Sequence, residues 1–388
     1  MLYILISVII CLLGVGGFLF KIGYISRGRE QITLGNIEKD REWPTLSVVI
    51  PARNEEKNIG RSLGSMALQD YPADKLEIIV VDDYSEDKTH DIVDGIAKKT
   101  DIKIRCIMGR PLPKGWLGKS NACMTGALEA TGEWIFFADA DTYSEPGMLR
   151  AVVDFAMKKD IDLLSFNPKQ DMISLAEKLL LPGLFISVAS SIRFDESNDP
   201  DKETAIANGQ AMMFKHSSYK EVEGHQVVAG EISEDLEFAK AMKGRGYKIY
   251  WAFGDKIMST RMYTGTMEIW HGFSKNMNKI MECRNKRDVF TSALKSLMLA
   301  WGTPVLLGIS IASYMNEPTT YRMAAMGISG ITQLALIIMY MVLIAELHLP
   351  MMYSVTVPVG ISFQSLLVMR AYILSKEKSI KWKGRTIS

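Results

Sequence analysis

Two carboxylates stand one residue apart directly after an apolar run near the middle of the chain. Asp139 and Asp141 follow a strand that we predict over 134–138. Burying two like charges together is costly unless a cation holds them. A hard divalent cation takes oxygen ligands and can bridge a carboxylate to substrate phosphates, so the pair is a candidate Mg²⁺ or Mn²⁺ clamp for a diphosphate. The spacing alone fits an ordinary turn at a strand end equally well.

A lysine that follows two glycines forms a second candidate site. Lys119 follows Gly115 and Gly118 and precedes a predicted helix that Ser120 could cap. Main-chain N–H groups at the start of that helix, with Lys119 as a point charge, would suit a diphosphate. The alternative is a solvated lysine on a surface turn.

An acidic pair, Glu234 and Asp235, begins a short amphipathic helix that we expect to end near Gly244 and Gly246. One of these carboxylates could act as a general base that deprotonates an incoming hydroxyl group. Acidic residues in a first helical turn are also often no more than a complement to the helix dipole.

Two further polar segments follow predicted strands, over 51–56 and 80–89. Asp83 in the second segment could accept hydrogen bonds from a base N–H or a ribose hydroxyl, or it could cap the next helix, as we expect of Ser85 and Asp87. No GxGxxG sequence follows the first strand and no Walker lysine loop is present. Dinucleotide-dependent oxidoreductases and P-loop enzymes are therefore disfavoured.

The elements that position these residues alternate between short β-rich runs and helical stretches. This alternation predicts an α/β domain with a mostly parallel sheet, in which ligands bind beyond the carboxyl ends of the strands. In the first helix, Ile59, Leu63 and Met66 repeat at helical spacing, and Asn54 is placed to cap it. The predicted strands are Leu46 to Pro51, Glu77 to Asp82, Ile102 to Met108, Trp134 to Ala138 and Ile161 to Phe166.

Size, charge and cysteine content limit the class of protein. At 388 residues the chain has room for one sizeable domain with attachments, and a net charge of +1 gives no reason to expect a nucleic acid partner. The four cysteines are scattered without a CxxC pair, which argues against a disulfide framework and a zinc site. Reduced thiols fit a domain that faces the cytoplasm.

The ends of the chain are apolar. Met1 to Phe20 is uncharged and is followed by Lys21, Arg27 and Arg29, which predicts a membrane anchor that leaves the following residues in the cytoplasm. A cleaved signal peptide is the alternative, but no basic residue precedes the apolar run and no clear cleavage site follows it.

Three apolar segments near the C-terminus are each long enough to cross a bilayer: Ser296 to Asn316, Met323 to Ala345 and Leu347 to Met369. Three crossings from a cytoplasmic domain would put the basic tail outside, against the positive-inside tendency. Pro350 and Pro358 indicate that the last segment could be kinked, re-entrant or interfacial. We therefore expect an anchor over 1–22, a catalytic domain over 44–275, a basic linker over 276–295, membrane helices over 296–373 and a basic tail over 374–388.

The ordered motifs resemble the family 2 glycosyltransferases of the GT-A fold. The resemblance covers roughly 44–275, and within the family it is closest to membrane-anchored enzymes that glycosylate polyisoprenoid lipids, the carotenoid (diaponeurosporenoate) and hopanoid-associated glycosyltransferases. The motifs that carry it are PARNEE at 51–56, VVDDYSEDKT at 80–89, GWLGKSNA at 115–122, FFADAD at 136–141 and GHQVVAGEISEDLEFAKAMKGRGYK at 224–248.

The resemblance implies a nucleotide-sugar donor, a divalent metal and one displacement with inversion at the anomeric carbon. By position, Asp139 with Asp141 would be the metal-binding DxD motif, Asp139 would also contact the nucleotide sugar, and Asp235 would be the general base. Lys119 would approach the diphosphate. The nucleoside would lie against Pro51, Ala52, Glu55 and Asp83.

Two features limit what the resemblance implies. The QxxRW signature of processive polysaccharide synthases is absent after Asp235, so repeated extension of a polymer is not expected. The motifs do not fix the donor base, although uridine is the commonest in this kind of enzyme. The apolar segment Pro168 to Arg193 could lie along the bilayer and admit a lipid acceptor, or it could be a buried helix.

Several polar residues beside the acidic pair could border the acceptor, and each is as readily a packed or solvated residue of the fold. They are Asn208, Gly209, Gln210, His225, Glu234, Arg261, Trp270 and His271. The predicted function is transfer of one hexose from a UDP-sugar to a lipid at the cell membrane. The alternatives are a polyprenyl-phosphate or polar glycan acceptor, or a membrane scaffold without turnover.

Overall fold

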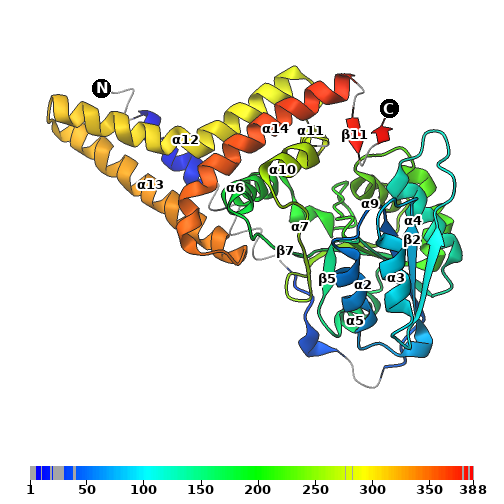
Figure 1. Cartoon of the computed structure of the whole chain (residues 1–388). Coiled ribbons are helices and arrows are strands. Elements are labelled where there is room, and N and C mark those ends of the chain that lie inside the picture. Colours follow the sequence, from blue (N-terminus) through cyan, green and yellow to red (C-terminus); the bar gives the residue numbers. More distant parts are fainter. Residues whose placement is uncertain are drawn as a thin grey trace. The chain divides into compact units, whose positions relative to one another are not determined.

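The structure, a computed structural model, divides into two compact units. It describes residues 6–9, 11–17, 20, 30–37, 41–275, 277–281, 283–377, 380–382 and 385–387. The sheet unit comprises Gly28–Asp171 and Arg193–Met262, and the helical unit comprises Met1–Arg27, Met172–Ile192 and Tyr263–Ser388. Each unit is described by itself (Figure 1).

A seven-stranded sheet forms the centre of the sheet unit. Its β8 strand is antiparallel to both neighbours and the other neighbouring pairs are parallel, so the expected mostly parallel sheet is confirmed. The strand order is β3 (Lys103–Met108), β2 (Leu76–Asp82), β1 (Leu46–Ala52), β4 (Trp134–Ala138), β8 (Ala211–Lys215), β6 (Leu163–Asn167) and β9 (Ile249–Phe253). A smaller sheet contains β5 (Thr142–Ser144), β10 (Met258–Thr260) and β7 (Lys169–Gln170).

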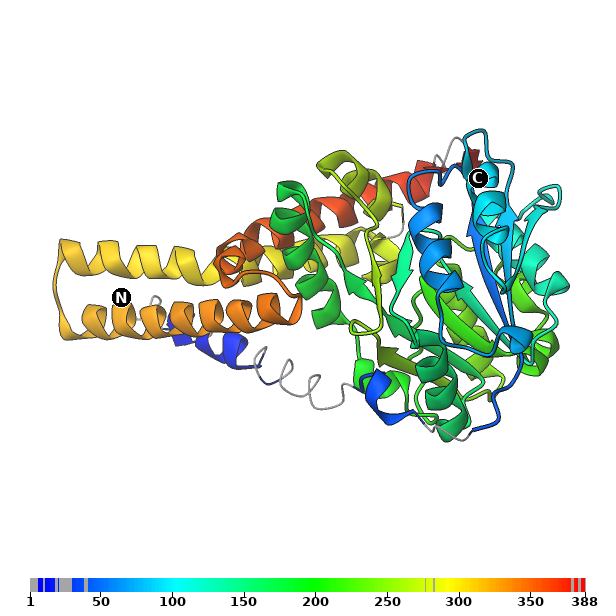
Figure 2. The ribbon, with the colours of Figure 1, turned by 60° about the horizontal axis from the view of Figure 1, so that its bottom comes forward.

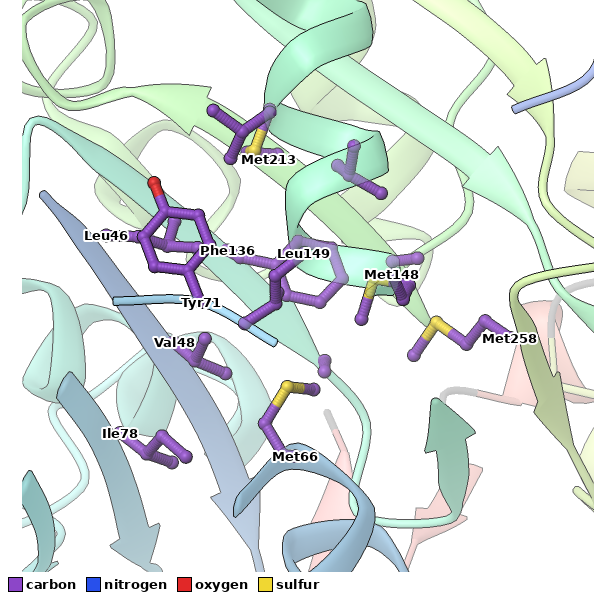
Figure 3. Packing of buried hydrophobic residues seen from close by; sticks show 14 of the residues in the cluster. Leu46, Val48, Met66, Tyr71, Ile78, Phe136, Met148, Leu149, Met213 and Met258 are labelled. Atoms are coloured by element: carbon purple, nitrogen blue, oxygen red, sulfur yellow. The ribbon is translucent and has the colours of Figure 1, made fainter. Parts of the chain in front are cut away.

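Helices pack on both faces of the large sheet. They are α2 (Ile59–Ala67), α3 (Thr89–Ala97), α4 (Gly118–Glu129), α5 (Met148–Lys159), α7 (Phe194–Ser197), α8 (His216–Glu221) and α9 (Glu234–Gly244), with short 3-10 turns η1 (Leu34–Asn36), η2 (Ala73–Lys75) and η3 (Gly224–Val228). Successive residues of β1 alternate between two hydrophobic cores, with Val48 in one and Val49 in the other. Figure 3 shows the first core, where Val48 and Phe136 from neighbouring strands lie near Met66 and Leu149.

The predicted strands agree with β1, β2, β3, β4 and β6 to within two residues at each end. Three predicted helix caps, at Asn54, Ser85 and Ser120, are wrong. The helix α2 begins after Asn58, and Asn54 instead has a positive φ of 52° and links two loops: its N–H donates to Ser85 Oγ (2.9 Å). Ser120 lies inside α4, which begins after Leu117.

The helical unit contains the long apolar helices. Its elements are α6 (Leu175–Ser191), α10 (Thr266–Phe273), α11 (Met277–Ile280), α12 (Lys286–Asn316), α13 (Thr320–Glu346), η4 (Met351–Thr356), α14 (Val357–Glu377), β11 (Ile380–Trp382) and β12 (Arg385–Ile387). By length and composition, three helical stretches of the described residues could cross a membrane: α12, α13 and Met351–Lys376. The predicted N-terminal anchor lies partly outside the described residues.

Within the helical unit, α6 and α14 approach each other most closely at Gly183 and Gly360. A Cβ atom built on Gly183 would lie 2.7 Å from Gly360 Cα, and one built on Gly360 would lie 2.8 Å from Gly183 Cα. Both distances are too short for real atoms, so a side chain at either position would force the helices apart.

Replacing Gly360 with leucine should therefore destabilise the helical unit. We expect a loss of about 1–3 kcal/mol, because overpacking shifts backbone and neighbouring side chains. The measurement is the thermal unfolding midpoint of the detergent-solubilised full chain. Gly330→Leu in α13 is the matched control, since a Cβ there meets nothing within 4 Å. Equal midpoints for the two variants would contradict this account of the crossing.

Candidate active site

The carboxyl ends of β1, β2 and β4 bring the predicted nucleotide-binding segments to one edge of the sheet. The parallel register of β1 and β2 places Ala52 opposite Asp82. β4 lies on the other side of β1 and ends at Ala138, just before Asp139. Segments that are far apart in the sequence therefore meet at this edge.

Hydrogen bonds join the loop after β1 to the loop after β2. Arg53 Nη1 donates to the carbonyl oxygen of Asp83 (2.6 Å), and the N–H of Glu55 donates to Thr89 Oγ1 (2.8 Å). The side chain of Asp83 is buried, with Arg53 Nη1 4.0 Å from its Oδ2. The four candidate nucleoside-binding residues thus come from the end of β1 and from two adjacent loops that support each other: Pro51 and Ala52 end β1, and Glu55 and Asp83 lie in the loops.

Asp87 helps to cap the next helix, as we expect from its position. Its Oδ1 accepts a hydrogen bond from the N–H of Thr89 (3.0 Å), the first residue of α3. Its pKa lies below the ordinary value: burial would raise it, but the hydrogen bonds from Thr89 and Glu56 lower it by more. Ser85, by contrast, accepts from Asn54 and does not cap α3.

One ammonium group joins two carboxylates at the centre of the edge. Lys119 Nζ lies 2.8 Å from Asp139 Oδ1 and 3.0 Å from Glu234 Oε1. Burial alone would lower the pKa of Lys119, but the two carboxylates raise it well above its ordinary value. Burial raises the pKa of Glu234, Asp235 raises it further, and Lys119 opposes both. Lys119 therefore stays charged and holds the two acids together.

Asp141 has the properties expected of a cation ligand. Burial, Asp139 and Glu55 together raise its pKa to about 7, although Lys119 lowers it. Its Oδ1 is buried and finds no hydrogen-bond partner among the described residues. An added cation would relieve both the like-charge repulsion and the unsatisfied oxygen.

The described part of the chain contains no group of three or more His, Cys, Asp or Glu side chains placed to hold a metal. A complete protein cage is not required here, because Mg²⁺ is commonly held by one or two carboxylates together with substrate phosphates and water. Asp139 and Asp141 supply this partial ligand set, so the residues present fit a divalent cation that is shared with a diphosphate.

Asp235 is fixed by two main-chain N–H groups. Its Oδ2 accepts from the N–H of Gly209 (2.8 Å), and its Oδ1 accepts from the N–H of Leu236 (2.8 Å). The carboxylate is thus held at the start of α9, next to the ion pair of Lys119 with Glu234. A carboxylate in a fixed position next to a cation is suited to act as a proton acceptor for a bound hydroxyl group.

The absence of a side chain at Gly209 lets these groups converge. A Cβ there would lie 3.0 Å from Lys119 Nζ, 3.2 Å from Glu234 Oε1 and 3.5 Å from Asp235 Cβ. The first two distances are shorter than ordinary contacts, so a methyl group would displace both ends of the ion pair.

Replacing Gly209 with alanine should lower kcat about tenfold with little change in stability, because misplaced catalytic groups are costly even when the fold survives. Steady-state kinetics and thermal unfolding of the same preparations measure the two effects. Gly95→Ala in α3 is the control, since its Cβ would meet nothing within 4 Å and alanine is favoured in helices. Equal kcat values would show that the crowding at Gly209 is not catalytically important.

Asn208 and Gln210 form a polar strip on either side of Gly209. Asn208 Nδ2 donates to Asn167 Oδ1 (3.0 Å), and Gln210 Oε1 accepts from Gln170 Nε2 (3.1 Å). Gln210 Nε2 is buried and has no partner among the described residues. The structure therefore brings Asn208, Gly209 and Gln210 to the site. We propose that they contact an acceptor there.

Three of the other candidate acceptor residues lie in different surroundings. His225 is 3% exposed, and its Nδ1 lies 2.7 Å from the hydroxyl of Tyr219 in an aromatic cluster. Burial and the charge of Lys119 lower its pKa to about 3, so it is a neutral core residue. Trp270 belongs to α10 of the helical unit, where its ring centroid lies 5.7 Å from that of Phe363. Arg261 is partly exposed in the sheet unit.

Two supporting features were not predicted from the sequence. Arg53 holds the backbone of Asp83, a role suggested only by its position directly after the first strand. The segments around Gly115 and Gly230 also meet: the N–H of Leu117 donates to the carbonyl of Ala229 (2.7 Å), and a Cβ on Gly230 would lie 2.9 Å from the carbonyl oxygen of Gly115. The sequence signal for this close approach is the glycine that each of the two segments contains.

The sequence of the chain is similar to those of known glycosyltransferases. Residues 47–223 match the family described as Glycosyl transferase family 2. A 4,4'-diaponeurosporenoate glycosyltransferase of Staphylococcus haemolyticus is 28% identical over 261 residues, which cover 66% of this chain and 67% of the relative. The protein of the same name from Staphylococcus aureus is 24% identical over 291 residues, 74% of each chain.

Two further matches are a relative that is similar over a shorter stretch and a solved structure. A probable glycosyltransferase of Bacillus subtilis, YdaM, is 44% identical over 108 residues, which cover 28% of this chain and 25% of the relative. The mannosyltransferase PcManGT from Pyrobaculum calidifontis, solved in complex with GDP-Man and Mn²⁺, aligns with a TM-score of 0.54 at 17% identity over 96% of this chain and 98% of its own. The fold is GT-A-like, as expected from the sequence.

Proposed function

We propose that the chain, whose residues 47–223 match the family described as Glycosyl transferase family 2, is a membrane-bound, inverting enzyme that moves one hexose from a UDP-sugar to a lipid acceptor. The observation that carries the proposal is the cluster in which Lys119 joins Asp139 and Glu234 beside the fixed carboxylate of Asp235. It combines a charge for a departing diphosphate with a base for an incoming hydroxyl group.

The proposed reaction is a single displacement at the anomeric carbon. The acceptor oxygen forms a bond to that carbon on one face while the bond to the diphosphate oxygen breaks on the other, and the nucleoside diphosphate leaves. Asp235 takes the proton of the acceptor hydroxyl as the new bond forms. Lys119 places a positive charge where negative charge develops on the diphosphate, and its partly buried position strengthens that interaction.

Asp139 and Asp141 would hold the divalent cation, Mg²⁺ or Mn²⁺. When it is bound, such a cation stabilises the negative charge of the leaving diphosphate. The unpartnered Oδ1 of Asp141 and its raised pKa support this assignment. Pro51, Ala52, Glu55 and Asp83 would bind the nucleoside in the two joined loops, with uridine proposed because it is the commonest base in the family.

A lipid acceptor is supported by the names of the relatives and by the apolar helices. The match to this chain covers 67% and 74% of the length of two relatives named as diaponeurosporenoate glycosyltransferases. Three helical stretches are apolar and long enough for a membrane. We propose a carotenoid acid or another polyisoprenoid as acceptor, with a multi-pass protein in the cell membrane and the catalytic unit in the cytoplasm.

Transfer of labelled sugar into lipid tests this proposal. Membranes containing the full chain are incubated with radiolabelled UDP-glucose, other UDP-sugars or GDP-mannose, and the products are separated into organic and aqueous fractions. We expect label in the organic fraction from a UDP-sugar, in a product that mild acid does not release as a polyprenyl-phosphate sugar would be. Label only in water-soluble glycan, or only in an acid-labile lipid, would contradict the proposed acceptor.

A further inference from the structure

The helices α12 and α13 form an antiparallel hairpin in the helical unit. They are joined by the turn at 317–319 and lie side by side in both views (Figures 1 and 2). Thr303 Oγ1 donates to Gln333 Oε1 (2.7 Å), and the hydroxyl of Tyr340 donates to the carbonyl of Leu299 (3.4 Å). As α13 advances along the sequence, it therefore runs back along α12.

The helix α14 does not run toward the tip of this hairpin. Near its start, Ser362 Oγ accepts from Trp301 Nε1 (2.8 Å) in the middle of α12. Further along, Leu367 and Val368 share a hydrophobic core with Val289 near the beginning of α12. The end of α14 consequently lies beside the start of α12, and away from the turn at 317–319.

The uncharged run is shorter in α14 than in α12 and α13. In α12 the uncharged run from Ser296 to Asn316 is about 31 Å long, and in α13 the run from Met323 to Ala345 is about 34 Å long. In α14 it extends only from Val357 to Met369, about 20 Å. A bilayer has a hydrocarbon core of about 30 Å, which each of the first two runs can span as one α-helix. The uncharged part of α14 is too short by itself and reaches that length only together with η4, in the stretch Met351–Lys376.

The charges separate the two ends of the bundle. At the turn, Arg322 forms an ion pair with Glu317 (2.7 Å) and donates to the carbonyl of Ser313, so this end carries a compensated charge. At the other end, exposed cations come from the first turn of α12 and the last turns of α14: Lys286, Arg287, Arg370 and Lys376. Asp288 is an acidic residue of the same first turn of α12, but lysine and arginine are in excess at this end. Such an excess favours the cytoplasmic side of a membrane.

We propose that α14 is a re-entrant helix that enters only the bilayer leaflet nearest the catalytic unit, so that the α12–α13 hairpin alone crosses the membrane in the C-terminal region. The partner that α14 would contact is the lipid of that leaflet. Both the residues before α12 and the basic tail after α14 then lie on one side. This arrangement removes the conflict that three crossings would create with the positive-inside tendency.

The close packing of α6 on α14 extends the same assignment to α6. Since Gly183 and Gly360 leave no space between the two helices, α6 must occupy the same leaflet as α14. Resting on the proposed function, this places an apolar helix pair in the leaflet from which a lipid acceptor would approach the enzyme.

Single cysteines in the full chain test the proposal. Ala73→Cys reports the side of the sheet unit, Pro318→Cys reports the hairpin turn, and Ser375→Cys reports the end of α14; all three positions are exposed. Cells are treated with a membrane-impermeant maleimide before and after permeabilisation. The unsubstituted chain, with its four cysteines, gives the background labelling.

We expect Ser375→Cys to behave like Ala73→Cys and opposite to Pro318→Cys. Labelling of Ser375→Cys together with Pro318→Cys, on the side opposite to Ala73→Cys, would overturn the proposal, because α14 would then cross. Identical labelling of all three would also overturn it, because the hairpin would not cross. The result does not depend on turnover, so it can fail while the proposed glycosyltransferase reaction stands, or the reverse.

Discussion

Asp235→Asn should lower kcat about a thousandfold while the affinity for the nucleotide changes by less than threefold. General bases typically contribute between about a hundredfold and ten-thousandfold, and asparagine cannot accept the proton of the acceptor hydroxyl. Both oxygens of Asp235 accept main-chain hydrogen bonds, so asparagine keeps the size of the side chain but loses its basicity and one of these two hydrogen bonds. Nucleotide-release kinetics at saturating donor and acceptor give kcat, and calorimetric titration with UDP gives the affinity.

Glu237→Gln is the matched control for this prediction. It makes the same acid-to-amide change in the first turn of the same helix, where Glu237 forms only an exposed ion pair with Lys240. We expect its kcat to remain within twofold of the original. If Asp235→Asn retained more than a tenth of the activity with an alcohol acceptor, Asp235 would not be the base. A carboxylic acid acceptor is already ionised near neutral pH, so with such an acceptor the loss should be smaller.

Asp141→Asn should weaken nucleotide binding in the presence of Mg²⁺ or Mn²⁺ by about a hundredfold and reduce its dependence on pH. In the metal-free protein the pKa of Asp141 is raised to about 7, so below pH 7 a proton competes with the cation for the carboxylate. Affinity in the original chain should therefore fall about tenfold or more for each pH unit below 7. Asparagine does not titrate, so the variant should show a smaller slope, to which the terminal phosphate of UDP still contributes.

Calorimetric titration of UDP at pH 6, 7 and 8, with and without the metal, measures this effect. Asp101→Asn, at an exposed position outside the site, is the control and should keep the full pH slope. The same slope in Asp141→Asn as in the original chain would assign the titration to another group. Undiminished metal-dependent binding in the variant would remove Asp141 from the cation site altogether.

The strands and the acids at their ends could be predicted because they are local features of the sequence. The core strands β1 and β2 are covered on both faces, and each contains an apolar run, Val48 to Ile50 and Ile78 to Val81, which marks both the strand and the point where it ends. The positions of Asp83 and Asp139 at the carboxyl ends of strands followed directly. Parallel pairing then brought them to the same edge.

Contacts between distant segments could not be predicted in this way. The ion pair of Lys119 with Glu234 joins the starts of two helices that lie more than a hundred positions apart, and Gly209 acts through the side chain that it lacks. Asn54 was expected to cap a helix by its position, but hydrogen bonds to the neighbouring loop hold it instead. His225 is polar in sequence, yet it packs among Phe137, Tyr219 and Phe238 in the core.

The most direct test of the central claim is nucleoside diphosphate release by the purified full chain. The detergent-solubilised protein is supplied with a panel of nucleotide sugars, with and without a membrane lipid extract, beside the Asp141→Asn and Asp235→Asn variants. We predict lipid-stimulated release of UDP from one UDP-sugar, which is lost in Asp141→Asn and reduced in Asp235→Asn. Release that is unaffected by lipid, or that persists in Asp141→Asn, would contradict a metal-assisted transfer to a lipid acceptor at this site.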